Sequence, residues 1–362
     1  MEHIAIDLGG RESQVCIRSS EGTILEERRV ATTRLGVALK RRPPSCVVLE
    51  TCAEAFAVAD QALALGHEVR VVPSTLVKAL GVGARGVKND LADARNLSAA
   101  SCRMPLPSVH VPSAEARRRK AVCGSRDALV GARTRLIQTV WGQLRATATR
   151  PRSGTPETFP ARARTALGGT APPHQESVLV AIETLTTAIR AADGAVRALA
   201  AQDPVCARLM SVPGVGPVTA VRFVAALDDA TRFHGAHQVA SYLGLTPGEH
   251  SSGDHQRTTH ITKAGSAAVR RCLVQASWVA RRHAARDPLV QWSLQIERRR
   301  GKRIAVVAQA RKLAGILFAM WRDGTRYAPQ RGALPPPAPP PVDLHDVIPL
   351  CELATEVSAP SD

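Results

Sequence analysis

Apolar and polar residues alternate through the first part of the chain, which predicts strands followed by strand–helix units. Ile4, Ile6 and Leu8 fall on one side of an extended segment. Further extended segments are expected at residues 14–18, after Gly22, at 46–50 and at 69–72. The Ala-rich segment 53–65 is expected to be helical. This order of a hairpin followed by strand–helix units indicates an α/β domain over residues 1–112.

The next block has helical periodicity and is strongly basic at its start. Residues 113–150 contain nine Lys and Arg against only Glu115 and Asp127. After a Pro- and Gly-rich break at 151–173, apolar residues recur at heptad spacing, at Val178, Ile182, Leu185, Ile189, Ala192, Val196 and Leu199. We expect residues 113–205 to form an antiparallel helical hairpin or coiled coil, as a spacer within the chain or as a dimerisation arm.

The last part of the chain divides into a helical region and a tail of different composition. Residues 206–328 are expected to form a helical domain with one polar loop. Residues 329–362 contain a polyproline stretch at 335–341 followed by acidic residues, with no Lys or Arg after Arg331. Such a composition predicts a disordered tail.

Composition and charge narrow the possible functions. The chain has 362 residues, enough for two to three domains, and 48 Lys and Arg against 31 Asp and Glu give a net charge of +17. This excess favours a polyanionic partner, most simply nucleic acid. The eight cysteines form no C-x-x-C pair, which disfavours a zinc knuckle or a disulfide framework. Without a long apolar run or a secretion signal, we expect a cytoplasmic protein with no membrane partner.

Four acidic residues are candidates for a metal site. Asp7 and Glu50 each end a predicted strand, while Asp90 and Asp93 are spaced to share one helix face. Carboxylates in this number suit two Mg²⁺ ions, which can stabilise the attacking and leaving oxygens of a phosphodiester. Two alternatives remain. An Asp-x-x-Asp pair arises by chance on exposed helices, and Ile6–Gly10 also suits the phosphate-binding turn of sugar-kinase-like and actin-like ATPases.

A glycine turn between two predicted helices is a candidate for binding nucleic acid. Residues 209–220 contain Gly214 and Gly216 in a Gly-x-Gly turn. Glycines allow positive φ and let backbone N–H groups approach a phosphate at a helix N-terminus. This helix–hairpin–helix pattern predicts contact with the DNA backbone without sequence reading. The alternative is a simple turn between helices.

A polar, basic loop follows this turn. Ser251 and Ser252 precede Gly253 and could present a nucleophile, although a Ser-Gly pair is also common in ordinary loops. The histidines at 250, 255 and 260 are five residues apart, a spacing that does not favour zinc. Phosphate contacts are expected from the cationic side chains Arg257, Lys263, Arg270 and Arg271.

Taken together, motifs in a fixed order resemble one family. They are Ile6-Asp7, Leu49–Thr51, Lys88–Ala94, Pro213–Gly216, Ser252-Gly253 with Ile261–Gly265 and Arg270, and Arg311–Ala314 with Leu317. Over residues 1–328 the chain resembles the DEDD transposases of bacterial insertion sequences, the insertion sequence 110 and 1111 family. The break at 151–173 and the tail match no motif of that family.

The resemblance implies a fold and a chemistry. The N-terminal domain would be RuvC-like, with an RNase H fold, and Asp7, Glu50, Asp90 and Asp93 would bind the metal. The helical C-terminal domain would supply a serine that attacks DNA and forms a phosphoserine link. That serine matches Ser252, with Ser251 adjacent. Members of this family form dimers or tetramers, so that one protomer's serine can meet another's acidic residues. They are directed to DNA by a structured RNA that the element encodes.

Two other functions remain open on the residues alone. A Holliday-junction resolvase-like nuclease would use the four carboxylates with water as nucleophile, and both serines would then be dispensable. A non-catalytic nucleic-acid-binding protein would tolerate loss of charge at Asp7 or Asp90. A sugar-kinase-like ATPase leaves the glycine turn and the serine loop unexplained.

Overall fold

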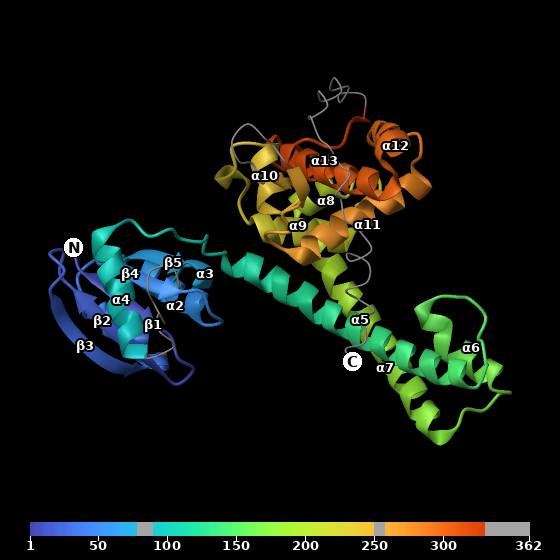
Figure 1. The fold of residues 1–362 in the computed structure, drawn as a ribbon, viewed down its shortest axis with the longest axis horizontal. Helices are drawn as coiled ribbons and strands as arrows, with labels where there is room; N and C mark the ends of the chain where they lie inside the picture. The colour runs from blue at the N-terminus through green and yellow to red at the C-terminus, as the bar shows by residue number, and fades with distance from the viewer. Residues whose placement is uncertain (78–89, 250–257, 330–362) are drawn as a thin grey trace. The chain divides into compact units, whose positions relative to one another are not determined.

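The computed structural model describes residues 1–77, 90–249 and 258–329, and for Val77, Asp90 and Thr258 the backbone alone (Figure 1). The chain separates into two compact units, Met1–Ser113 and Ala114–Asp362. Ser251, Ser252, Arg257 and residues 330–362 of the predicted disordered tail lie outside the described residues. The four domain limits predicted from the sequence stay predictions.

The first unit is built on a five-stranded sheet with the order β3-β2-β1-β4-β5. The strands are β1 (His3–Asp7), β2 (Glu12–Arg18), β3 (Ile24–Ala31), β4 (Cys46–Glu50) and β5 (Glu68–Val72). β1, β2 and β3 pair antiparallel, whereas β1, β4 and β5 run parallel. The predicted strands are confirmed. This mixed sheet is consistent with an RNase H-like N-terminal domain.

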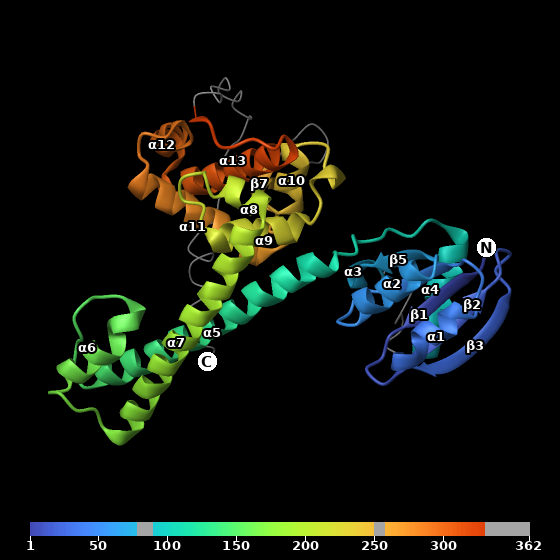
Figure 2. The same cartoon turned by 180° about the vertical axis from the view of Figure 1, so that it is seen from behind.

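Helices cover both faces of the sheet, as Figures 1 and 2 show from opposite sides. On one face, Ile6 and Leu49 pack with α1 (Leu35–Lys40) and α2 (Ala55–Ala64). On the other face, Ala5 and Val48 pack with Leu97 of α4 (Asp90–Arg103). A short helix, α3 (Ser74–Val77), follows β5. Because side chains alternate along a strand, the two hydrophobic clusters separate odd from even positions of β1.

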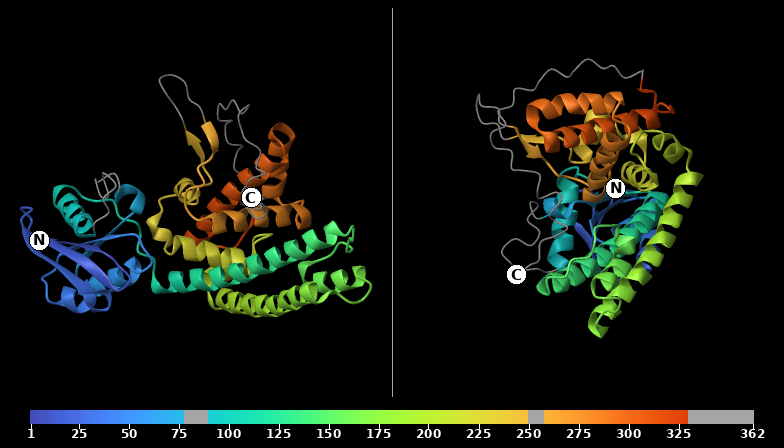
Figure 3. Two further views of the ribbon diagram at one scale, coloured as in Figure 1. Left: turned by 60° about the horizontal axis from the view of Figure 1, so that its bottom comes forward. Right: turned by 90° about the vertical axis from the view of Figure 1, so that its right-hand side faces the viewer.

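The second unit begins with two long antiparallel helices, α5 (Ala114–Ala146) and α7 (Pro173–Gln202), which lie side by side (Figure 3). Arg126 hydrogen-bonds to Asp193, and Arg133 to Thr186, so residue numbers rise along α5 as they fall along α7. Of the seven predicted seam residues, Ile182, Ile189, Val196 and Leu199 are buried and the others half-buried. The apolar stripe of α7 therefore has a partner within the chain.

The Pro- and Gly-rich break expected at 151–173 contains a short helix in its middle. A short 3₁₀ turn (Pro156–Thr158) leads into α6 (Phe159–Ala166). Phe159 and Ala163 of this helix are buried in a small core with α5 and α7 residues, among them Val140 and Ile182. Burial of an aromatic side chain offsets the low helix propensity of the flanking prolines and glycines.

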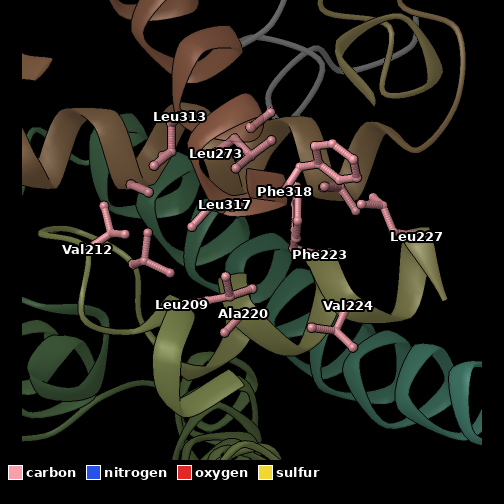
Figure 4. Close-up of a cluster of buried hydrophobic side chains, with 14 of the residues drawn as sticks. Leu209, Val212, Ala220, Phe223, Val224, Leu227, Leu273, Leu313, Leu317 and Phe318 are labelled. Atoms are coloured by element: carbon pink, nitrogen blue, oxygen red, sulfur yellow. The ribbon is translucent and has the colours of Figure 1, made fainter. Parts of the chain in front are cut away.

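A helical bundle forms the rest of the second unit. Its helices are α8 (Pro204–Leu209), α9 (Pro217–Leu227), α10 (Ala236–Tyr242), α11 (Ala267–His283), α12 (Pro288–Arg300) and α13 (Lys302–Arg322). Figure 4 shows their shared core, in which Phe223 of α9 and Phe318 of α13 are fully buried. α13 is the one helix among the described residues long and apolar enough to cross a membrane, and half of it is buried in this bundle, as expected for a core helix.

The polar loop of the bundle emerges from a small sheet that the sequence did not predict. β6 (Pro247–Glu249) and β7 (Thr258–Ile261) pair antiparallel, with Pro247 opposite Ile261 and Glu249 opposite Thr258. Both strands are too short to show a clear alternation of apolar and polar residues, which explains why they were missed.

Candidate active site and nucleic-acid interface

Asp7 and Glu50 lie at the ends of two neighbouring parallel strands. The register pairs Ile6 with Leu49, and Asp7 and Glu50 each follow by one residue. Neighbouring strands are about 4.8 Å apart, so these two carboxylates leave adjacent points of one sheet edge. By alternation, both side chains share a face with Ala5 and Val48, which is the face that α4 covers.

Two contacts fix how α4 lies on this face. The His3 ring is 2.7 Å from the Ser101 hydroxyl, and Arg18 donates to the Ser98 hydroxyl at 2.9 Å. The second half of α4 therefore lies at the start of β1, and its first half extends toward the end of β1, where Asp7 is. Eight helical residues from Ser101 to Asp93 span about 12 Å. Four strand residues from His3 to Asp7 span about 13 Å.

Asp93 thus lies near the height of Asp7, one helical turn before the buried Leu97. Its Oδ1 atom is shielded from solvent and has no hydrogen-bond partner among the described residues. A buried carboxylate oxygen without a donor is costly unless a cation or water satisfies it. Asp90 begins α4 one turn further, and only its backbone is described.

The donor set suits a hard divalent cation. Asp7, Glu50 and Asp93 offer carboxylate oxygens, the ligands that Mg²⁺ prefers, and the orphaned Oδ1 of Asp93 fits a ligand role. Among the described residues, no group of three or more His, Cys, Asp or Glu side chains is close enough to hold a metal ion. The Asp90 side chain is not among the described residues, so the predicted set of four metal ligands stays a prediction.

The two glycines of the turn between α8 and α9 have different surroundings. Gly214 has a φ of +87°, and a Cβ atom there would lie 2.2 Å from the carbonyl oxygen of Ala276 in α11. This glycine is therefore required by packing inside the bundle. Gly216 precedes α9, and no atom lies within 4 Å of the Cβ position. Open space at a helix N-terminus can admit a phosphate, so Gly216 fits the predicted contact better than Gly214.

The cationic residues near the loop fall into two groups. Lys263 is exposed, and so is Arg271, whose guanidinium is 3.7 Å from the Asp127 carboxylate. Arg270 is buried, and its Nη1 atom donates to three backbone carbonyls. The expectation that Arg270 contacts phosphate is not supported by this geometry, because its guanidinium is enclosed by the protein. Arg257 lies outside the described residues.

A run of cations at the corner between α12 and α13 was missed in the sequence. Arg298 and Arg299 lie in the last turn of α12, Lys302 and Arg303 begin α13, and all four are exposed. The ammonium group of Lys302 is 5.2 Å from the Trp278 ring of α11, which places this corner beside the last turns of α11. The sequence does contain a signal for this surface, since five of the six residues 298–303 are Lys or Arg. Such a density of cations is typical of phosphate-binding surfaces.

An RNase H-like sheet with carboxylates at one edge, and a strongly cationic helical unit, define a class of proteins that act on nucleic acid. Comparison with known families narrows this class. A model of DEDD transposases of insertion sequence IS110, described as a transposase, matches residues 4–148. A model described as the transposase IS116/IS110/IS902 family matches residues 206–291.

Relatives cover most of the chain. A probable family 20 transposase of Pseudomonas aeruginosa is 29% identical over 91% of this chain and 99% of its own length. The transposase for insertion sequence element IS1111A of Coxiella burnetii is 28% identical over 88% of both chains. The transposase for insertion sequence element IS1328 of Yersinia enterocolitica is 26% identical over 90% of this chain and 98% of its own.

The chain belongs to the IS110 family of insertion-sequence transposases. The first matched region contains the acidic sheet edge, and the second contains α9, α10 and α11 of the helical bundle. Transposases of this type bind DNA and cut and transfer its strands, and the DEDD family suggests the use of a divalent metal.

Proposed function

We propose that this protein cuts and rejoins DNA through a covalent phosphoserine intermediate at Ser252, assisted by Mg²⁺ at Asp7, Glu50, Asp90 and Asp93. A structured RNA encoded by the element selects the DNA, and two or four copies of the chain act together. Membership of the family does not by itself identify the nucleophile, the ion or the guide.

One observation supports the metal site above all others. Asp7 and Glu50 end adjacent parallel strands on the face under α4, and Asp93 of that helix has a buried oxygen without a partner among the described residues. Asp7 and Glu50 leave adjacent points of the sheet edge, and two like charges so placed repel one another unless a cation is present. The cost of this arrangement is offset when the site holds a metal.

The four carboxylates would hold two Mg²⁺ ions by their oxygens. When bound, these ions neutralise charge on the reacting phosphate and lower the cost of deprotonating a hydroxyl. The chain itself contributes the positions of the carboxylates: β1 and β4 fix Asp7 and Glu50, and α4 fixes Asp90 and Asp93. Placement on regular elements limits their movement.

The serine would serve as the nucleophile of a balanced transesterification. The Ser252 hydroxyl loses its proton, its oxygen bonds to phosphorus, and the bond from phosphorus to a deoxyribose oxygen breaks. That oxygen takes up a proton and becomes a free hydroxyl. In the reverse direction, a deoxyribose hydroxyl of another strand attacks the phosphoserine and restores Ser252. One phosphoester replaces another at each step, so rejoining needs no ATP.

Asp93 and Ser252 are separated by more than 150 residues in the sequence. The proposed reaction requires them to meet, within one chain or between protomers. The α5–α7 pair is our candidate for the contact between protomers. Gly214 and Gly216 at the helix–hairpin–helix turn, with Arg257, Lys263, Arg271 and the exposed cations of the α12–α13 corner, would bind nucleic-acid backbone.

A resolvase-like nuclease is the second candidate. The same acidic edge could activate water, which would cut DNA without a covalent intermediate. This alternative requires only the metal site and not the serine loop. It predicts full cleavage activity in the double substitution of Ser251 and Ser252 by Ala.

The guide is tested by purifying the full-length protein from its natural cells and sequencing the RNA that accompanies it. A single discrete RNA that maps beside the gene supports RNA-guided recombination. Heterogeneous RNA, or none, contradicts guidance by RNA. It would favour an enzyme that recognises DNA directly.

A further inference from the structure

The segment before β6 (residues 242–246) contacts the segment after β7 (residues 262–265). We call this contact the crossing. Gly244, just before β6, has a φ of +68°, and a Cβ there would lie 2.0 Å from the Ala264 carbonyl oxygen. Gly265, just after β7, has a φ of +74°, and a Cβ there would lie 2.1 Å from the Tyr242 carbonyl oxygen. The incoming and outgoing segments are therefore in backbone contact that admits no side chain at either glycine.

Lys263 adds a third residue with positive φ, +54°, to the same crossing. For a residue with a Cβ this conformation is uncommon and costs free energy. It is held by backbone bonds: the Lys263 amide donates to the Gly244 carbonyl at 3.2 Å, and the Thr262 amide to the Thr246 carbonyl at 2.9 Å. The crossing is specified by several contacts at once.

Arg270 of α11 hydrogen-bonds to both segments of the crossing. Its Nη1 atom donates to the carbonyls of Leu243 at 3.1 Å, Ala264 at 2.7 Å and Gly265 at 3.2 Å. The first carbonyl precedes the hairpin and the other two follow it, so one guanidinium joins both of its ends. The side chain is 6% exposed, and burial lowers the pKa of its guanidinium.

The cost of this arrangement suggests a role beyond stability. Burying a guanidinium is expensive, and among the described residues its hydrogen-bond partners are backbone carbonyls and not a carboxylate. A two-stranded hairpin is marginally stable by itself. Without the crossing, β6 and β7 would not hold a fixed direction relative to α11.

We infer that Arg270 is a positioning residue, which together with Gly244 and Gly265 fixes β6 and β7, the two strands between which Ser252 lies in the sequence. This inference rests on the proposed role of Ser252. Arg270 touches neither DNA nor the reacting atoms. Its guanidinium sets where the hairpin stands, so its loss affects the chemical step more than it affects DNA binding.

The test is Arg270→Lys in the full-length protein with its co-purified RNA, on DNA that carries the element's ends. A lysine keeps the charge, but its ammonium is one bond closer to the backbone than Nη1 is, so it does not reach the same three carbonyls. We expect covalent protein–DNA adduct to form about 10- to 100-fold more slowly, because small misplacements of a nucleophile have effects of this size. DNA affinity should stay within about twofold. An unchanged rate of adduct formation overturns the inference.

Arg222→Lys is the matched control. Arg222 is also buried, donates to the Cys123 carbonyl at 2.8 Å, and pairs with Asp127, away from the hairpin. It should lower the melting temperature as Arg270→Lys does, with no change in the adduct rate of the folded protein. A wild-type protein that forms no adduct would refute the phosphoserine mechanism, which is a different outcome from equal rates in wild type and variant.

Hydrogen exchange in the wild-type protein tests the crossing even if the variant does not fold. The Thr262 and Lys263 amides should exchange about as slowly as those of α11, because the crossing opens only with the bundle. Exchange at the rate of an unprotected loop would mean that Arg270 does not fix the hairpin.

Discussion

Asp7 and Glu50 are neighbours across the parallel pair β1 and β4, one residue past the Ile6–Leu49 rung. Two like charges at this separation disfavour the folded state unless a cation lies between them. The sheet therefore builds a local electrostatic cost at the edge that α4 covers. A fold that retains such a cost gains from a bound metal, and we therefore expect the two carboxylates to govern cleavage, metal binding and formation of the covalent adduct.

Neutralising either carboxylate should abolish strand cleavage and spare DNA binding. For Asp7→Asn and Glu50→Gln we expect at least about a 1,000-fold loss of cleavage, because each removes a metal ligand. DNA affinity should change by less than about twofold. Gel-based cleavage and binding assays measure the two quantities. Glu12→Gln, an exposed neighbour in β2, should behave as wild type. Lost binding in Asp7→Asn would mean that this acid is structural.

The same substitutions should separate metal binding from stability. Mg²⁺ should raise the melting temperature of the wild-type protein, because a ligand at 100 times its dissociation constant stabilises by about 2.7 kcal/mol. In Asp7→Asn the increase should vanish, and without metal the variant should melt no lower than wild type. Differential scanning calorimetry with and without EDTA is the measurement. An equal Mg²⁺ response in both proteins would place the ion elsewhere.

Exposed cations of the second unit should govern the salt dependence of DNA binding. Lys263→Gln and Arg299→Gln should each reduce the slope of log affinity against log salt by about one unit, as expected when one phosphate contact is lost. Arg164→Gln is the control, because Arg164 already hydrogen-bonds to the carboxylates of Glu176 and Glu183. A residue whose removal leaves the slope unchanged lies outside the interface.

The contact that orients α4 should make the first unit sensitive to acid. Burial and the charge of the N-terminus lower the pKa of His3 from its ordinary 6.5. The folded state therefore binds fewer protons than the unfolded state in this range. The contribution of neutral His3 to the free energy of unfolding is fully present above about pH 6.5. It is lost as the pH falls through the lowered pKa that His3 has in the folded state.

Melting curves between pH 7.5 and 5 measure this loss, and His3→Gln serves as the reference. The wild type should lose more stability than His3→Gln over this interval, since the substituted side chain does not titrate. A parallel decline of the two proteins would show that the contact of His3 with Ser101 does not sense pH.

Strands and acidic residues were predictable from the sequence because local patterns determine them. Alternation at Ile4, Ile6 and Leu8 located β1, and the spacing of Asp90 and Asp93 located one face of α4. The register that brings Asp7 beside Glu50 was not predictable, since it depends on pairing between strands about 40 residues apart.

Two errors have a common cause, which is that a residue type does not reveal its burial. Arg270 is a residue type that commonly contacts phosphate, but its side chain is buried inside the bundle. The segment around Phe159 has the prolines and glycines of a linker, and its aromatic ring fills a core between α5 and α7. Long-range packing decided both positions, and no local pattern represents it.

Formation of a covalent adduct tests the central claim most directly. The full-length protein with its RNA is incubated with labelled DNA carrying the element's ends, with Mg²⁺ or EDTA, and denatured before electrophoresis. We predict a protein–DNA adduct in Mg²⁺ that disappears with EDTA, in Asp7→Asn and in Ser252→Ala, but persists in Ser251→Ala. Cleavage without any adduct, or an adduct that survives in Ser252→Ala, would contradict the account.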